Sequence, residues 1–198
     1  MSSDITATTI QDTQAASTTF IAVAARPTGA FNLANTRFNA LQARAVTVTT
    51  TGSADAGKTV TIVGTDYNDK PESQVITSLG SASTVGGPKF FKTITSATCS
   101  AQYAANVSVG MASAGVATFY AGRRRLKAFT IISTGTAGII DFFSGDPDDG
   151  GQIFSTFSSG VDNSADDVFI PDEGILFKQN LSVYYNTTHS KLLTAFHA

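Results

Sequence analysis

Short runs of alternating or β-branched residues recur along the chain, and clusters of Gly, Asp, Ser and Pro separate them. Examples are Arg44–Thr50, Thr59–Val63 and Asn106–Gly110. β-Branched side chains are stiff about χ1 and pack well on a pleated surface, so these runs favour strands over helices. Strands at a spacing of roughly 8–12 residues with turn residues between them are typical of a sandwich or barrel. The pattern therefore predicts an all-β fold.

The composition limits the classes of partner. Hydrophobic residues make up 42% and charged residues 14% of the 198 residues, which indicates a globular chain. The net charge of −2 gives no general attraction to nucleic acid or to an anionic membrane, so we expect neither as a partner. Cys99 is the only cysteine, which excludes an internal disulfide and fits a reducing compartment. Residues 1–18 have no apolar segment of the signal-peptide type, so we expect no secretory signal there.

The order of the expected strands suggests two consecutive modules. The segment TTTGSADAGKTVTIVGTD places a Gly turn between two strands, and ISTGTAGIIDFFSGDPD repeats this arrangement with a shorter turn. Residues 1–17 have no hydrophobic period, so we expect an extended arm that the modules do not need for folding. We predict an N-terminal arm over residues 1–17, a first β-sandwich or jelly-roll-like module over 18–115 and a second over 116–198.

One segment matches a nucleotide-binding motif. Gly52–Thr59 reads GSADAGKT, which fits the P-loop pattern G-x-x-x-x-G-K-[ST]. A P-loop needs a helix after the lysine, because the helix N-terminus helps to hold the phosphates. The following run instead predicts a strand. We interpret the segment as a hairpin in which Gly52 and Gly57 adopt positive φ and Lys58 is a solvated charge, and the second copy of the turn has no lysine.

Two Asp-rich segments invite a metal hypothesis. Asp146–Gly151 has Asp at its first and third positions and Gly at its sixth, as in a calcium-binding EF-hand loop. However, Gly150 and Phe157 occupy positions at which that loop needs ligands. We predict polar turns and no metal site, both here and at Asp162–Asp167.

The sequence offers few candidates for catalytic or sugar-binding residues. The two histidines, His189 and His197, are expected to be exposed, and no G-x-S-x-G nucleophile elbow is present. Sugar-binding surfaces use flat aromatic side chains, for which the candidates are Tyr67, Tyr184 and Tyr185. We expect no catalytic residue, no cofactor and no enzymatic activity.

The only concentrated basic cluster is Arg123, Arg124 and Arg125. A strand through this cluster would place Arg123 and Arg125 on one face and Arg124 on the other. The simplest interpretation is a solvated strand start. The more specific interpretation is an anchor for an acidic partner surface, so these three residues are our candidate partner contacts.

Three parts of the chain resemble a known class of protein. They are VTVTTTGSADAGKTVTIVGTDYNDKPESQVIT, then KFFKTITSAT with NVSVG, and then GRRRLKAFTIISTGTAG with IPDEGILF. Together they resemble small β-rich structural proteins of tailed-bacteriophage virions, including capsid decoration (cement) proteins and tail or adaptor components. The resemblance covers most of residues 44–198 and rests on strands and turns, so it transfers no site residues.

The resemblance implies a non-enzymatic virion structural protein made in the cytoplasm of a bacterial host. The leading hypothesis is a capsid decoration protein that stabilises the head shell. Its partners would be the major capsid protein or other virion proteins, and it would form a homo-oligomer, with a trimer favoured. The alternatives are a head–tail adaptor or tail component, and, in a different class, a glycan-binding β-sandwich module.

Overall fold

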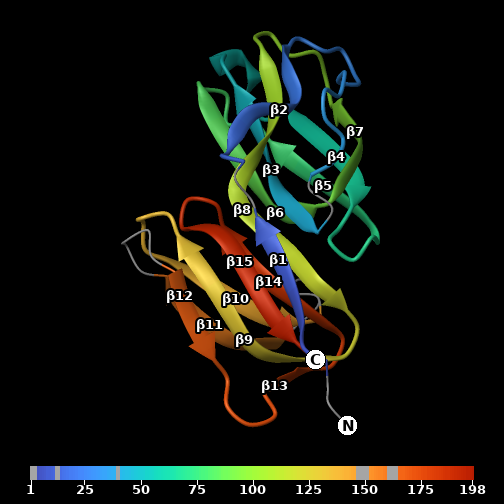
Figure 1. The fold of residues 1–198 in the computed structure, drawn as a ribbon. Coiled ribbons are helices and arrows are strands. Elements are labelled where there is room, and N and C mark those ends of the chain that lie inside the picture. The colour runs from blue at the N-terminus through green and yellow to red at the C-terminus, as the bar shows by residue number, and fades with distance from the viewer. Residues whose placement is uncertain (1–3, 12–13, 39–40, 146–151, 160–164) are drawn as a thin grey trace. The chain divides into compact units, whose positions relative to one another are not determined.

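A computed structural model describes residues 4–11, 14–38, 41–145, 152–159 and 165–198. Strands dominate these residues, and their only helix is a 3₁₀ turn at Ser53–Asp55. The chain forms two compact units, one of residues 15–113 and the other of residues 1–14 and 114–198 (Figure 1). The paired strands are antiparallel. The all-β prediction is confirmed.

The N-terminal unit is a sandwich of two sheets. Its strands are β2 (Ser17–Ala25), β3 (Gln42–Thr50), β4 (Thr59–Thr65), β5 (Pro71–Thr77), β6 (Ser83–Phe91), β7 (Thr93–Cys99) and the first part of β8 (Val107–Ala121). One sheet has the order β5-β4-β7. The other contains β8, β3 and β6 in that order, with β2 paired to β8.

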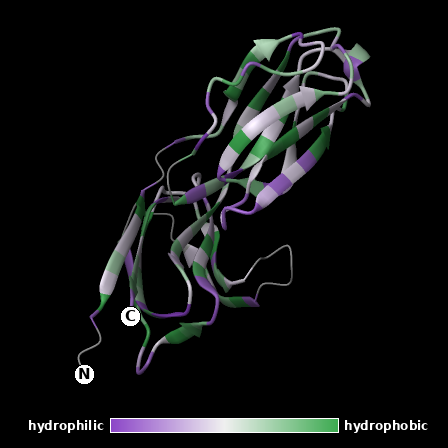
Figure 2. Ribbon diagram, turned by 90° about the vertical axis from the view of Figure 1, so that its right-hand side faces the viewer, coloured by the Kyte–Doolittle hydropathy of each residue, from purple (hydrophilic) through white to green (hydrophobic). Residues whose placement is uncertain are grey.

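Alternate residues of the strands build the core of this unit. Val60 and Ile62 of β4 are fully buried in the same cluster as Val46 and Val48 of β3 and Val109 of β8. Figure 2 shows the result as hydrophobic bands that alternate with paler or hydrophilic bands along the strands. Complete burial of each such side chain contributes about 1.5–3 kcal/mol.

The C-terminal unit is a second sandwich. Its strands are β1 (Thr6–Gln11), the rest of β8, β9 (Arg124–Ser133), β10 (Gly138–Ser144), β11 (Gln152–Ser159), β12 (Ala165–Phe169), β13 (Ile175–Phe177), β14 (Asn180–Asn186) and β15 (Ser190–His197). One sheet has the order β1-β15-β9-β12, and β13 also pairs with β9. The other has the order β11-β10-β14-β8. An aromatic cluster lies in the core, where the rings of Phe129 and Phe142 are 4.9 Å apart and those of Phe129 and Phe157 are 4.3 Å apart.

The expected N-terminal arm is extended, but residues 6–11 are part of the fold. They form β1, which pairs with β15 so that Thr9 lies opposite Thr194. Ile10 is 4% exposed and belongs to the core of the C-terminal unit. The segment lacks a hydrophobic period because an edge strand on this sheet needs only one apolar anchor. The expectation that the modules fold without the arm is therefore wrong for this strand.

Both Gly turns connect strands of different sheets, so the hairpin prediction is wrong. β3 pairs with β6, whereas β4 pairs with β5 and β7. Likewise β9 pairs with β15 and β10 pairs with β14. The strands themselves lie where they were predicted. Alternation along a strand defines its faces but does not say which neighbour it pairs with, so the two topologies have the same local pattern.

The glycine-rich segment Gly80–Pro88 is largely strand. β6 starts at Ser83 and β7 begins after Lys92. Gly87 lies against the side chain of Gln74, and an added Cβ would come within 2.1 Å of Gln74 Nε2. This glycine therefore marks a close approach within the sandwich and not a turn.

Candidate functional site

The P-loop-like segment has the wrong geometry for a P-loop. Lys58 precedes strand β4, so no helix N-terminus faces the loop. Gly57 has φ +77°, as predicted, but Gly52 has an extended backbone with φ −121°. A Cβ added at Gly52 would lie 2.5 Å from the Cβ of Ala105. Gly52 is therefore required for close packing against the loop that contains Ala105, and the expectation of a positive φ there is wrong.

Lys58 is held by the protein, which corrects the expectation of a solvated charge. Its Nζ donates to Asp55 Oδ1 at 2.7 Å and to the carbonyl oxygen of Gln102 at 2.6 Å. It also lies 5.4 Å from the centre of the Tyr103 ring. These contacts direct the ammonium group toward the protein, where a nucleotide phosphate would have to displace Asp55.

Asp55 is the centre of this arrangement. Its carboxylate is fully buried and accepts hydrogen bonds from the backbone N–H groups of Ala104 (2.7 Å) and Ala105 (3.0 Å). Burial acts to raise the pKa of Asp55, but the hydrogen bonds from Lys58 and from the two N–H groups outweigh it and hold the pKa below its ordinary value. The carboxylate thus joins the segment before β4 to the loop before β8. The motif-like sequence has a structural role.

Nucleotide is expected to leave this loop unaffected. Thermal melts with and without Mg-ATP should coincide, because Lys58 is already paired and a strand follows it. Lys58→Ala should lower the melting temperature in the absence of nucleotide by several degrees, since it removes a partner of a buried carboxylate. An ATP-dependent rise in melting temperature that Lys58→Ala abolishes would contradict this prediction.

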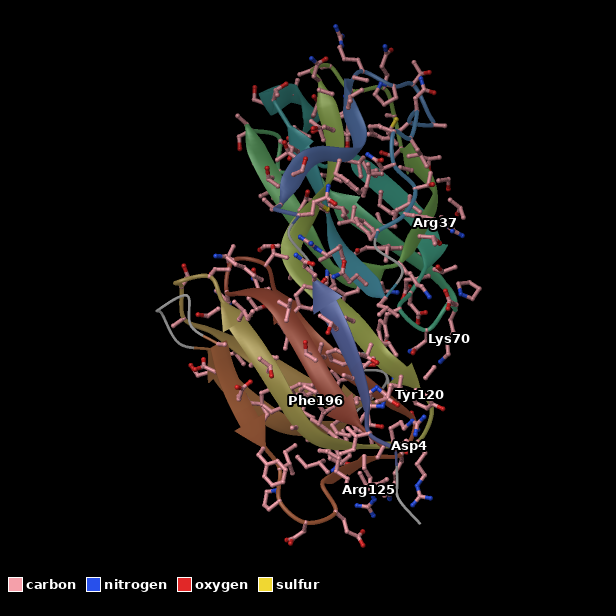
Figure 3. All side chains as sticks on the ribbon, viewed as in Figure 1. Asp4, Arg37, Lys70, Tyr120, Arg125 and Phe196 are labelled. Atoms are coloured by element: carbon pink, nitrogen blue, oxygen red, sulfur yellow. The ribbon has the colours of Figure 1, made fainter. Side chains whose placement is uncertain are left out.

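The three arginines line one pocket of the C-terminal unit, together with Leu176 and Ala198. β9 starts at Arg124, so Arg123 lies in the turn after β8, where Gly122 has φ +136°. The predicted division of the cluster between two strand faces therefore does not keep the three side chains apart. The pocket has a volume of about 240 Å³. Figure 3 labels Arg125, which lines the pocket, and Tyr120, whose ring contacts Arg124.

Each arginine has a different environment. Arg125 forms an ion pair with Glu173, with 3.0 Å between Nη2 and Oε2. The guanidinium of Arg124 lies 4.1 Å from the centre of the Tyr120 ring, a cation–π contact. Arg123 is exposed. The backbones of Arg125 and Ala198 exchange two hydrogen bonds of 2.9 and 3.0 Å, which fix the strand at the pocket wall.

The N-terminal unit has an uncharged surface that the sequence analysis did not predict. The outward side chains of β4, β5 and β7 meet in register, with Thr61 opposite Val75 and Thr98. We define the hydroxyl–valine face as Thr61, Val63, Ser73, Val75, Ser96 and Thr98. None of these six residues carries a charge, and Val75 is 59% exposed. The signal in the sequence was the alternation of Thr, Ser and Val with buried apolar residues.

The sequence analysis also considered three tyrosines and two histidines as site residues, and the structure shows how far each is buried. Tyr67 and Tyr185 are buried, so they cannot form a sugar-binding platform, and Tyr184 is half-buried. His189 is half-buried. The Asp146–Gly151 loop lies outside the described residues, as do the first three positions of Asp162–Asp167. Among the residues that the structure describes, no three His, Cys, Asp or Glu side chains form a group that could hold a metal ion.

His197 is buried, so the expectation that it is exposed is wrong. Its Nε2 is 3.0 Å from Thr8 Oγ1 of β1, and its ring lies 5.8 Å from that of Tyr120. Burial, and secondarily the charge of Arg124, lower the pKa of His197 below its ordinary value. β15 extends to this residue because the backbone of Ala198 still pairs with Arg125.

Fold and surfaces together define the chain as an all-β protein of two sandwich units. No protein-family model matches it, and no curated protein matches its sequence. Across the described part of the chain, no helix is long and apolar enough to cross a membrane.

Proposed function

We propose that this chain is a non-enzymatic virion structural protein, and specifically a capsid decoration protein that binds the outer head shell. The observation that carries the proposal is the hydroxyl–valine face. Charged side chains are depleted in the cores of protein interfaces, because removing a charge from water is costly. A sheet face that exposes two valines among hydroxyl groups suits a flat protein partner better than it suits water alone.

Self-association is part of the proposal. The C-terminal unit exposes large apolar side chains on strands near its sheet edges, with Phe169 of β12 77% exposed and Ile153 of β11 59% exposed. Strand edges of this kind favour pairing with another copy, and a closed ring covers them without producing fibres. A trimer follows from the resemblance to decoration proteins, whereas the need for a partner follows from these exposed side chains.

A charge on the hydroxyl–valine face is expected to weaken binding to the shell. Val75→Lys places an ammonium group on the face, and a buried unpaired charge at an interface typically costs several kcal/mol. Binding to purified capsid shells, measured by co-sedimentation, should fall by at least about tenfold. Because Val75 is exposed, the melting temperature of the isolated protein should change little.

The matched control is Ala82→Lys, which adds the same charge at an exposed position in the loop before β6. It should leave shell binding unchanged. Loss of binding with both variants would indicate a general charge effect and contradict the role of the face. If the unmodified protein binds tail structures and not shells, the head assignment fails while the structural role stands. If it binds neither, the proposed function is wrong.

A further inference from the structure

The pocket of Arg123, Arg124 and Arg125 brings three guanidinium groups together, and one of them is paired with a carboxylate side chain. Glu173 pairs with Arg125, and no ion pair joins Arg123 or Arg124 to any of the described residues. The next cation on β9, Lys127, donates to the backbone oxygen of Asp172 and does not line the pocket. Two guanidinium groups at one pocket therefore retain their donors for another partner.

Among the three arginines, Arg124 indicates most specifically that an acceptor is missing from the pocket. Its Nε is buried and has no hydrogen-bond partner among the described residues. The ring of Tyr120 fixes the guanidinium from one side at 4.1 Å. A buried donor that lacks an acceptor costs roughly 1–3 kcal/mol, and more when the group is charged. An acceptor with negative charge that reaches this atom would remove this cost.

We propose that this pocket binds one oxyanion group, a phosphate or a carboxylate, with Arg123 and Arg124 as its principal donors. Planar guanidinium groups match the paired oxygens of both chemistries. The volume of about 240 Å³ is smaller than the roughly 300–1,000 Å³ of ordinary small-molecule sites, so it suits a single group. Arg125 supports the site, because its pairing with Glu173 and with Ala198 holds the strand in place. The inference is independent of the virion assignment.

The first experiment measures binding of two probes to the full chain by calorimetry at constant ionic strength. One probe is inorganic phosphate, and the other is glutamate blocked at its α-amino and α-carboxyl groups. Binding of phosphate alone assigns the site to phosphate groups, and binding of blocked glutamate alone assigns it to acidic side chains. Binding of both supports the shared oxyanion chemistry. If neither probe binds above the level seen with chloride, the proposal is wrong.

Variants locate the binding. Arg124→Gln should weaken it by at least about tenfold, because a charge-assisted hydrogen bond contributes roughly 1.5–3 kcal/mol. Arg124→Lys keeps the charge but loses the planar fork, so it should also bind more weakly than the unmodified protein. Lys127→Gln removes one charge from the same strand without touching the pocket and is the matched control. Equal weakening by Lys127→Gln and Arg124→Gln would show attraction to net charge alone and would overturn the proposal.

A second readout does not depend on affinity. The charge of Arg124 contributes to the lowered pKa of His197, so an anion bound at Arg124 should raise that pKa. Proton NMR titration of the two histidines with and without saturating probe measures the change, with His189 as the internal reference. A raised pKa for His197 alone supports the site, and an unchanged pKa at saturation contradicts binding at Arg124.

Discussion

Replacing Asp55 by alanine is expected to lower the free energy of unfolding by about 3–5 kcal/mol, the usual cost of breaking a buried charge pair. The substitution leaves the ammonium of Lys58 and the N–H groups of Ala104 and Ala105 without their acceptor. For a chain of this size, the melting temperature should fall by roughly 10 °C. Urea unfolding and thermal melts measure the two effects.

Protonation of the Asp55 carboxylate should make the protein less stable in acid. Because the pKa of Asp55 is lowered in the folded state, its contribution is complete above the unfolded pKa of about 3.9 and is lost as the pH falls through the lower folded pKa. Asp55→Asn should therefore be clearly less stable than the unmodified protein at pH 7, and the difference should shrink at pH 3. A difference that is constant between these pH values would contradict the assigned role of the charge.

Deleting residues 1–11 is expected to destabilise the C-terminal unit and to increase association beyond that of the full chain. The deletion removes the burial of Ile10, worth about 1.5–3 kcal/mol, and the hydrogen bonds of β1 to β15. It also converts β15 into an exposed edge strand and uncovers His197. Size-exclusion chromatography with light scattering should show larger species, and urea unfolding should show an earlier transition.

Two single substitutions separate these effects. Ile10→Ala removes the apolar anchor but leaves the backbone of β1 paired, so it should destabilise without promoting association. Thr8→Ala removes only the hydrogen bond to His197 and should cost about 0.5–1.5 kcal/mol. A truncated protein that has the same oligomeric state as the full chain and unfolds at the same urea concentration would show that β1 has no structural role.

The positions of strands could be predicted from local sequence patterns, but the partners of those strands could not. The run Thr59–Val63 identified a strand correctly, because β-branched side chains express their preference locally. The hairpin assignment failed because the partners of that strand, β5 and β7, are chosen by the packing of the two sheets. The same limit applies to β1, whose partner lies at the opposite end of the sequence.

In the candidate sites, too, features made by adjacent residues could be predicted, whereas features made by distant residues could not. The arginine cluster was visible because its residues are adjacent, but the sequence gives no reason to single out Arg124, since Tyr120 and the buried Nε are properties of the fold. The sequence analysis did not predict the pairing of Lys58 with Asp55. In a P-loop pattern the lysine binds phosphate, whereas here it binds the carboxylate three residues earlier. The hydroxyl–valine face required three strands to be placed side by side.

The pairing of β1 with β15 also determines when the C-terminal unit can finish folding during synthesis. The contact between Thr8 and His197 spans 189 positions of the chain. At about 5–20 residues per second, a ribosome needs roughly ten seconds or more to make the intervening segment, and during that time β1 has no native partner. Such distant contacts form late, since loop closure must precede them. A chain that stops before β15 can therefore never cover β1, and the exposed strand would mark the incomplete product for proteolysis or aggregation.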